Sequence, residues 1–415
     1  MSATTVTDTA TEPVGVGDPA APVAGFAAPA DVYRYAELLT EAERSVLADL
    51  RAVLDRHVRP LLADYWERGE FPYQVLPRLA ELDLMRPAAV TATGVEPSAL
   101  YHGFRTFELA RVDASLATMY NAQSGLFRTA VVRGGSAEQV AALDPRIRSF
   151  DYTGVFALTE PDHGSDVARG LATTARRDGA DWVIDGAKRW IGGAFTVDVI
   201  VVFATEPESG ALHAFLVPRQ SPGLTLRKIG GKTALRMMQN ADITLAGVRV
   251  PDSARLPHVR TFADVAGMLR RMRSDVAWIA TGVAAGAYEA AVRYTTTRTQ
   301  FGRPIGGFQL IQEKLARMLG NVTASLGAVV RLTQLQERGT FRDEDSALAK
   351  MLTSLSMRET VALAREVCGG NGITLETDVA RFHADAEAVY SYEGTHEINA
   401  LIVGRSITGR SAFNR

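Results

Sequence analysis

The stretch "YSYEGTHEI" near the end of the chain contains Glu393 directly before a glycine, at the edge of a predicted last helix. A carboxylate there has an ordinary explanation, because an acidic residue near a helix N-terminus interacts favourably with the helix dipole. It also has a chemical one, because a carboxylate in a closed apolar cleft gains basicity from desolvation and can remove a proton. Glu393 alone does not decide between these explanations.

Two stretches in the middle of the chain have the composition of ligand-binding turns. In "FALTEPDHGSD" (156–166) a predicted strand runs into a turn whose Gly164 and Ser165 can bring backbone N–H groups close to an anion. In "KRWIGG" (188–193) Trp190 is most simply a core residue, whereas the two glycines allow a partner to approach the backbone closely. Each turn alone is equally consistent with plain structure.

Two further stretches lie in the C-terminal half. "RTQFGRPIGGFQLIQ" (298–312) joins two predicted helices, and its Arg298 suits either a helix-capping role or bidentate binding of a phosphate. "CGGNGI" (368–373) ends a helix with glycines, for which a left-handed C-cap is sufficient explanation. Each signal is weak, but the order and spacing of all five stretches are specific.

The surrounding pattern divides the chain into regions that must position these stretches. Residues 1–36 are rich in Ala, Thr, Pro and Gly without a sustained period, which predicts a disordered tail. Apolar residues then recur at helical spacing after a capping-box pair, Thr40 and Glu43, which predicts a helical domain over 37–151. Short β-branched runs divided by Gly, Asp, Asn or Pro predict a β domain over 152–260.

The helical period returns after Thr261, and we expect a helical bundle over 261–415. Its predicted long segments are 262–300, 308–338, 344–369 and 395–411. A β domain between two helical domains leaves clefts at the junctions, where ligand sites tend to lie. The sequence therefore predicts an α+β chain with its ligand sites at the domain junctions.

Composition excludes several classes of function. The formal net charge of −2 argues against a nucleic acid or an anionic membrane as the main partner. The single cysteine, Cys368, excludes a disulfide within the chain and a cysteine-based metal site, and it suits a reducing compartment. We find no membrane-spanning run, no secretory signal and no peroxisomal address, and therefore expect a cytoplasmic location.

Taken together, the ordered motifs resemble the acyl-CoA dehydrogenase family over nearly all of residues 38–415. The resemblance implies an N-terminal helical domain, a middle β-barrel or sandwich domain and a C-terminal four-helix bundle. "YEGTHEINALIVGRSITG" looks most like the glutaryl-CoA dehydrogenase branch. "DYWERGEFP", "KRWIGG" and "ALRMMQNADI" are closer in wording to plant short-chain acyl-CoA oxidases.

The resemblance implies FAD-dependent oxidation of an acyl-CoA to its trans-2-enoyl thioester, as part of fatty acid metabolism. Glu393 matches the base that removes the α-proton, while the β-hydrogen leaves as hydride to flavin N5. The thioester oxygen would be held by the Glu393 backbone N–H and a flavin ribityl hydroxyl. The implied substrate-side positions are Ser165, Arg273, Gly394 and Ala117.

The resemblance also implies the cofactor-binding residues. The strand and turn of the middle domain, together with the Trp-Ile-Gly motif, would contact the flavin ring and its chain, whereas the C-terminal motifs would hold the FAD diphosphate and adenosine across a subunit contact. A homo-oligomer, expected to be a tetramer, follows from that arrangement. These residues are Phe156, Leu158, Thr159, Gly164, Ser165, Trp190, Ile191, Gly192, Arg298, Phe301, Gln309, Glu366, Gly369, Gly370, Thr395 and Phe413.

Two departures from the family pattern bear on specificity. Glutaryl-CoA dehydrogenases resemble this chain around "ARVDASLATMY" but have an arginine for the distal carboxylate where Ala117 stands here. A buried carboxylate without a cation would be costly, so we expect a short or branched uncharged acyl chain. Gly192 stands where many dehydrogenases have Thr, which leaves either room for dioxygen at the flavin edge or a gap filled by water.

The expected partners are an acyl-CoA or a carrier-bound acyl thioester, and an electron-transferring flavoprotein as the acceptor of electrons. An oxidase that passes electrons to O2 is the first alternative, because of Gly192. A flavin-containing binding protein without catalysis is the second, although it would be expected to carry a basic face. The sequence leaves the acyl group, and the choice between CoA and carrier protein, undecided.

Overall fold

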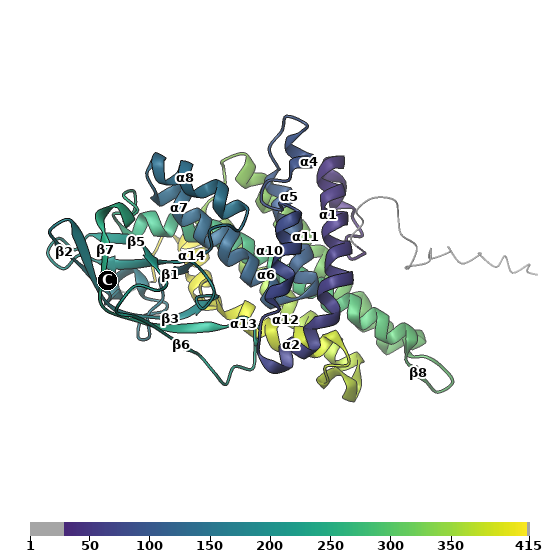
Figure 1. The fold of residues 1–415 in the computed structure, drawn as a ribbon. Coiled ribbons are helices and arrows are strands. Elements are labelled where there is room, and N and C mark those ends of the chain that lie inside the picture. Colours follow the sequence, from purple (N-terminus) through teal and green to yellow (C-terminus); the bar gives the residue numbers. More distant parts are fainter. Residues whose placement is uncertain (1–28, 413–415) are drawn as a thin grey trace, which may run out of the picture.

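The computed structural model describes residues 29–412, which follow one another as helices, a sheet and again helices (Figure 1). This order confirms the predicted α+β architecture. Phe413, expected near the cofactor, lies outside the described residues. Among residues 29–412, no helix is long and apolar enough to cross a bilayer.

The N-terminal region is helical from its start. The predicted capping box is confirmed: the Glu43 N–H donates to Thr40 Oγ1 (3.3 Å), and the Thr40 N–H donates to the Glu43 carboxylate (2.9 Å). Its elements are η1 (Tyr35–Leu38), α1 (Glu41–Val53), η2 (Leu54–Val58), η3 (Arg59–Leu61), α2 (Leu62–Arg68), η4 (Tyr73–Val75), α3 (Leu76–Glu81), α4 (Ala88–Thr91), α5 (Ala99–Val112), α6 (Ala114–Asn121), η5 (Ala122–Phe127), α7 (Arg128–Gly134) and α8 (Ala137–Arg148).

Ordered structure begins upstream of the predicted boundary at residue 37. Ala30 and Ala36 are buried in the core of the helical region. The Asp31 carboxylate accepts hydrogen bonds from the Tyr35 and Ala36 N–H groups at 2.9 and 2.8 Å. The last part of the segment predicted as a disordered tail is therefore anchored, because two small apolar side chains and one capping carboxylate fix it to the helices.

The middle region is one curled sheet, which contains seven strands in the part of the chain that the structure describes. Its order is β1-β4-β2-β3-β7-β6, and β5 pairs with β4. The β1/β4 and β2/β4 pairs are parallel, and the remaining pairs are antiparallel. The strands are β1 (Gly154–Ala157), β2 (Thr174–Asp178), β3 (Asp181–Gly192), β4 (Val199–Thr205), β5 (Leu212–Pro218), β6 (Leu224–Lys228) and β7 (Asn240–Pro251), with the short helices α9 (Val167–Gly170) and η6 (Asp252–Ala254).

The C-terminal region contains the long helices that the sequence predicted, together with a helix that it did not. The unpredicted helix, α13, directly precedes Glu393. The elements are α10 (Phe262–Thr297), the hairpin of β8 (Thr299–Gln300) and β9 (Arg303–Pro304), η7 (Ile305–Gly307), α11 (Gln309–Glu337), α12 (Asp343–Val367), η8 (Gly369–Ile373), α13 (Asp378–Ser391) and α14 (His396–Thr408).

Glycines let α5 and α10 pack closely. A Cβ at Gly282 would clash with the Phe107 carbonyl, and one at Gly286 would clash with the Arg111 carbonyl. At the other end of the contact, Gly103 lies against the Trp278 indole, whose N–H donates to Thr333 (3.0 Å). The two helical regions therefore share one continuous core.

A buried ionic network joins α6 to α13. Arg381 is 1% exposed, and its guanidinium donates to Asp113 at 2.5 Å and to Asp378 at 2.6 Å. Asp113 also caps α6 by accepting from the Leu116 N–H at 3.0 Å. On the same face of α13, Asp385 accepts from the Trp66 indole at 3.0 Å and from the Leu235 N–H at 2.7 Å. Arg381 thus supplies positive charge next to the buried carboxylates Asp113 and Asp385.

Replacing Arg381 with Met should lower the free energy of unfolding by about 3–5 kcal/mol, because Asp113 would remain buried without its cation. The measurement is urea unfolding of the cofactor-free protein, followed by circular dichroism. The exposed Arg317–Glu359 pair on the surface provides the control, and Arg317→Met should cost less than about 1 kcal/mol. Equal losses in the two variants would contradict a dominant role for the buried network.

Candidate active site

Glu393 lies in a strained turn between α13 and α14. Its φ is 57°, and that of Gly394 is 85°, so both residues occupy the left-handed region. A residue other than glycine is uncommon there, and such strain of about 1–3 kcal/mol is often associated with function. Thr395 follows as the N-cap of α14, accepting from the Ile398 N–H at 3.3 Å. Glu393 thus precedes the last helix instead of belonging to it.

Two side chains hold the backbone of this turn. The Lys350 ammonium group, on α12, donates to the carbonyls of Tyr390 (2.6 Å) and Gly394 (2.9 Å), which flank Glu393. The Asn399 amide donates to the carbonyls of Gly394 and Thr395, both at 2.9 Å. The backbone around Glu393 is therefore held from α12 and from α14.

The surroundings make Glu393 unusually basic. Burial raises the pKa of its carboxyl to about 7, against the opposing effect of the Arg273 guanidinium. Asp275 on α10 raises that pKa further, whereas Lys350 lowers it. Desolvation is the largest of these contributions. A carboxylate that titrates near neutral pH can act as a general base under physiological conditions.

Helix α6 forms the wall between the Glu393 turn and the sheet. Thr118 Oγ1 lies 3.2 Å from the hydroxyl of Tyr392, the residue before Glu393. The next residue, Met119, lies against Gly193 at the end of the Trp-Ile-Gly stretch: a Cβ added to that glycine would be 3.2 Å from Met119 Sδ. Ala117 is 1% exposed, so its methyl group is packed in the core of the protein.

A bulge in β3 projects Trp190 from the sheet. The register with β7 shifts between Lys188 and Ile191, and Trp190 has a φ of 65° and is 51% exposed. Bulges commonly re-aim a side chain in this way. The Asn240 amide fixes the bulge by donating to the Trp190 carbonyl at 3.0 Å. Ile191, in contrast, points into the sheet core, which leaves only its backbone for a ligand.

The space beside Gly192 is occupied. A Cβ at this position would overlap the terminal methyl group of Met238, which is 3% exposed. The Lys232 ammonium group holds the Met238 carbonyl at 2.5 Å and Asn240 Oδ1 at 2.6 Å. The sequence left room for dioxygen or a gap filled by water at this glycine; the structure instead has a methionine side chain there.

The expected flavin-contacting residues of the middle domain lie at the end of β1 and in the turn that follows. Phe156 packs on Phe203 with ring centroids 4.5 Å apart, and Leu158 is buried in the same core. The Thr159 carbonyl accepts from the Arg189 N–H at 2.8 Å, which joins this strand end to the Trp190 bulge. Gly164 and Ser165 are exposed, and no atom lies within 4 Å of a Cβ built on Gly164.

The expected phosphate-binding residues gather at the end of the bundle remote from the sheet, where Figure 1 labels β8. There the Asn371 amide of the GGNG stretch donates to the Tyr294 hydroxyl near the end of α10 at 3.0 Å. Phe301 is 93% exposed, and the other expected residues are also exposed: Arg298, Gln309, Glu366, Gly369 and Gly370. Within one chain these residues do not meet Trp190.

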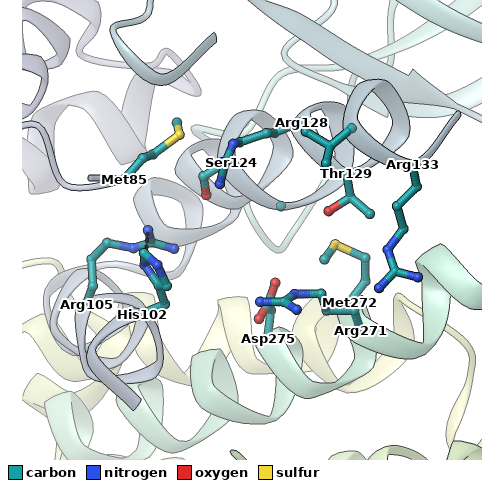
Figure 2. A pocket seen from close by; sticks show the side chains of 12 residues that line it. Met85, His102, Arg105, Ser124, Arg128, Thr129, Arg133, Arg271, Met272 and Asp275 are labelled. Atoms are coloured by element: carbon teal, nitrogen blue, oxygen red, sulfur yellow. Dashed lines mark hydrogen bonds between the residues drawn. The ribbon is translucent and has the colours of Figure 1, made fainter. Parts of the chain in front are cut away.

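A cavity of about 290 Å³ is lined by residues of α5, η5, α7 and α10, among them Met272 (Figure 2). Arg105 and His102 of α5, Ser124 of η5, and Asp275 of α10 project toward it. Burial raises the pKa of Asp275 to about 6. Asp275 thus lines the cavity and also raises the pKa of Glu393.

Several residues of this site could not be identified from the sequence. Lys350, Thr118 and Met238 stand in ordinary helical or strand-flanking patterns and acquire their roles only through tertiary contacts. The one signal was Lys350 itself, a charged residue within the apolar stretch "ALAKML" of α12. Arg273 and Glu393, in contrast, were both expected at the substrate side, and the Arg273 guanidinium lowers the pKa of the Glu393 carboxyl.

Comparison with known proteins identifies the three regions. Three family models match the chain: "Acyl-CoA dehydrogenase, N-terminal domain" over residues 40–151, "Acyl-CoA dehydrogenase, middle domain" over 155–248, and "Acyl-CoA dehydrogenase, C-terminal domain" over 262–408. A short-chain specific acyl-CoA dehydrogenase from mitochondria of Bos taurus is 31% identical over 379 residues, which cover 90% of this chain and 91% of the bovine protein.

Solved structures agree with this assignment. A glutaryl-CoA dehydrogenase from Mycobacterium smegmatis superposes with a TM-score of 0.85 and 36% identity, covering 93% of this chain and 99% of that one. A second structure of a glutaryl-CoA dehydrogenase from that organism, in complex with FADH2, gives a TM-score of 0.87 and 31% identity, covering 93% and 100%. The chain therefore belongs to the acyl-CoA dehydrogenase family, the flavin oxidoreductases that act on a CH–CH bond of an acyl-CoA.

Proposed function

We propose that this protein oxidises a short or branched, uncharged acyl thioester of CoA or of a carrier protein to the trans-2-enoyl thioester, with Glu393 as the base. One observation supports this most strongly: the Glu393 carboxyl is held in a strained turn where burial raises its pKa to about 7. Such a group is ionised to a useful extent at neutral pH and is still basic enough to accept a proton from carbon.

The backbone around Glu393 suits the binding of a thioester oxygen. Among the described residues, no hydrogen-bond acceptor faces the Glu393 N–H. A preorganised donor directed at an oxygen that becomes negatively charged is typically worth about 3 kcal/mol in the transition state. Gly394 has no side chain that would obstruct the thioester, and Arg273 brings a positive charge to the same side. The turn can therefore orient the α-carbon toward the carboxylate.

The residues present fit FAD, which supplies the acceptor of the β-hydrogen when it is bound. The exposed Trp190 indole offers an apolar ring, and no protein atom lies within 4 Å of Cβ positions built on Gly164, Gly369 and Gly370. Of the residues expected to hold the cofactor, Phe156, Thr159, Ser165, Trp190 and Thr395 lie around the sheet and the Glu393 turn. The exposed residues at the far end of the bundle would serve the second subunit of a homo-oligomer, which we expect to be a tetramer.

Helix α6 supports an uncharged acyl chain. Its sequence from Ala114 to Asn121 contains no cation, and Ala117 stands where a distal carboxylate would need an arginine. Arg381, at its N-terminal end, is already bound to Asp113 and Asp378. A charged acyl terminus next to this helix would therefore find no cation on the helix itself, and burying a charge without a partner is energetically costly.

Replacing Glu393 with Gln should abolish the reaction while leaving the flavin bound. A general base contributes about 100- to 10,000-fold to the rate, so anaerobic bleaching of the yellow enzyme by an acyl-CoA should slow by at least about 100-fold. Glu387→Gln, which changes an exposed glutamate on the preceding helix α13, is the matched control. Undiminished bleaching by the Glu393→Gln enzyme would remove Glu393 from the mechanism.

The pH dependence of kcat/KM should report the ionisation of Glu393. Because the base must be unprotonated, kcat/KM should rise with pH up to about 7 and fall about tenfold per unit below that value. Stopped-flow reduction under anaerobic conditions measures this limb, with the flavin absorbance at each pH as the check on cofactor retention. If kcat/KM falls only near pH 4.5, the ordinary pKa of a glutamate, burial does not raise the pKa of this carboxyl.

The occupied space beside Gly192 favours an electron-transferring flavoprotein over dioxygen as the acceptor. Met238 covers the position that a side chain at 192 would take, so reduced enzyme should reoxidise slowly in air. Met238→Ala should speed reoxidation several-fold by removing the side chain that fills this space, whereas Met238→Leu, of similar volume, should not. Fast reoxidation of the unaltered enzyme in stopped-flow experiments would instead establish an oxidase.

A further inference from the structure

We propose that Lys350 is a positioning residue for the base: its ammonium group binds the carbonyls on either side of Glu393, and its positive charge acts on the Glu393 carboxylate at neutral pH and below. This inference rests on the proposed function of Glu393 and adds a second residue, on a different helix. Lys350 has no role in that proposal, and no sequence motif pointed to it.

The geometry at Lys350 is that of a built site. The side chain is 0% exposed and extends from α12, where neighbouring hydroxyl groups bond to backbone carbonyls. Its Nζ lies 2.6 Å from the Tyr390 oxygen, at the end of α13, and 2.9 Å from the Gly394 oxygen, beyond Glu393. One ammonium group therefore spans the left-handed turn and stabilises a conformation that Glu393 would otherwise rarely adopt.

A buried lysine is a costly way to satisfy two carbonyls. Burial lowers the pKa of Lys350 to about 8, which reflects the energetic penalty of a charge away from water. Neutral side chains with N–H groups can make the same hydrogen bonds, as Asn399 does with Gly394 and Thr395. What Lys350 adds beyond those bonds is its charge, and the carboxylates of Glu393 and Glu397 favour that charge.

The charges around Glu393 come from several packed elements. Helix α10 contributes Arg273 and Asp275, which act in opposite directions on the pKa of Glu393. Helix α12 contributes Lys350, and α14 contributes Glu397, which faces Lys350. Asp385 of α13 reaches the same turn through Tyr392. Arg273 is partly exposed, so Lys350 is the fully buried cation of this set.

The test compares substitutions that separate the hydrogen bonds of Lys350 from its charge. Lys350→Met removes both, Lys350→Gln retains an N–H donor without the charge, and Lys350→Arg retains the charge. In the Met and Gln enzymes the acid limb of kcat/KM should move up by about half to one pH unit, because loss of a nearby cation raises a carboxyl pKa. The Arg enzyme should keep the limb at its original position.

The loss of the hydrogen bonds from Lys350 should lower kcat, measured at pH values where kcat no longer changes with pH. The kcat value should fall about tenfold in Lys350→Met, because a loosened turn misplaces the carboxylate, and by less in Lys350→Gln, while KM changes little. The control is Lys228→Met, which removes the lysine that donates to the Gly69 carbonyl at 3.1 Å and leaves the Glu393 turn untouched. Lys228→Met should not move the acid limb.

A second readout does not require activity. In flavin-free protein, infrared difference spectra between each Lys350 variant and its Glu393→Gln double mutant report the protonated carboxyl of Glu393. The titration midpoint should move upward by the same amount as the acid limb. Circular dichroism identifies any variant that does not fold. If Lys350→Met does not fold, the comparison of the Lys350→Gln and Lys350→Arg enzymes tests the role of the charge.

The outcomes separate this inference from the proposed function. An unchanged acid limb and an unchanged infrared midpoint in Lys350→Gln would overturn the role of the Lys350 charge while Glu393 remained the base. An equal shift in Lys228→Met would also overturn it, since the removal of any lysine would then act alike. If Glu393→Gln keeps full activity, the proposed function itself fails, whatever the Lys350 variants do.

Discussion

The contact between Arg381 and its two carboxylates is the constraint on which the rest of the active region depends. It joins the cap of α6 to α13, and these two helices carry Thr118 and Tyr392 to the positions where they meet. A buried ion pair of this kind adds little net stability compared with an apolar contact, but it permits few alternative arrangements. The direction in which α13 delivers Glu393 is therefore determined some three turns earlier, at Arg381.

Two opposing physical effects set the pKa of the Glu393 carboxyl. Burial makes the carboxylate basic, and the nearby cations Arg273 and Lys350 prevent it from remaining protonated at neutral pH. Either effect alone would give a poor catalyst: an exposed carboxylate is too weak a base, and an isolated buried one carries its proton already. The same principle applies to the fold, in which a strained turn is tolerated because α12 and α14 both hold its backbone.

Much of the fold was predictable because it is encoded locally. The spacing of apolar residues, helical in two regions and strand-like in the third, predicted the order of the three regions. The Thr40–Glu43 cap is set by neighbours in sequence. The anchoring of Ala30, the helix α13 and the Met238 contact depend on tertiary packing that no local pattern reports. For the site, Glu393 was found through a motif, whereas Lys350 was missed because its carbonyl partners lie 40 and 44 residues away.

The separation between the sheet, with strand β3, and the β8–β9 hairpin at the far end of the bundle has a consequence for how the protein behaves on dilution (Figure 1). On the proposed arrangement, each cofactor is held by the sheet of one chain and the bundle end of another. Cofactor affinity and subunit affinity then form a single linked equilibrium, because whatever separates the chains also opens every flavin site. Flavin would be lost as a function of protein concentration, and added flavin would hold the chains together.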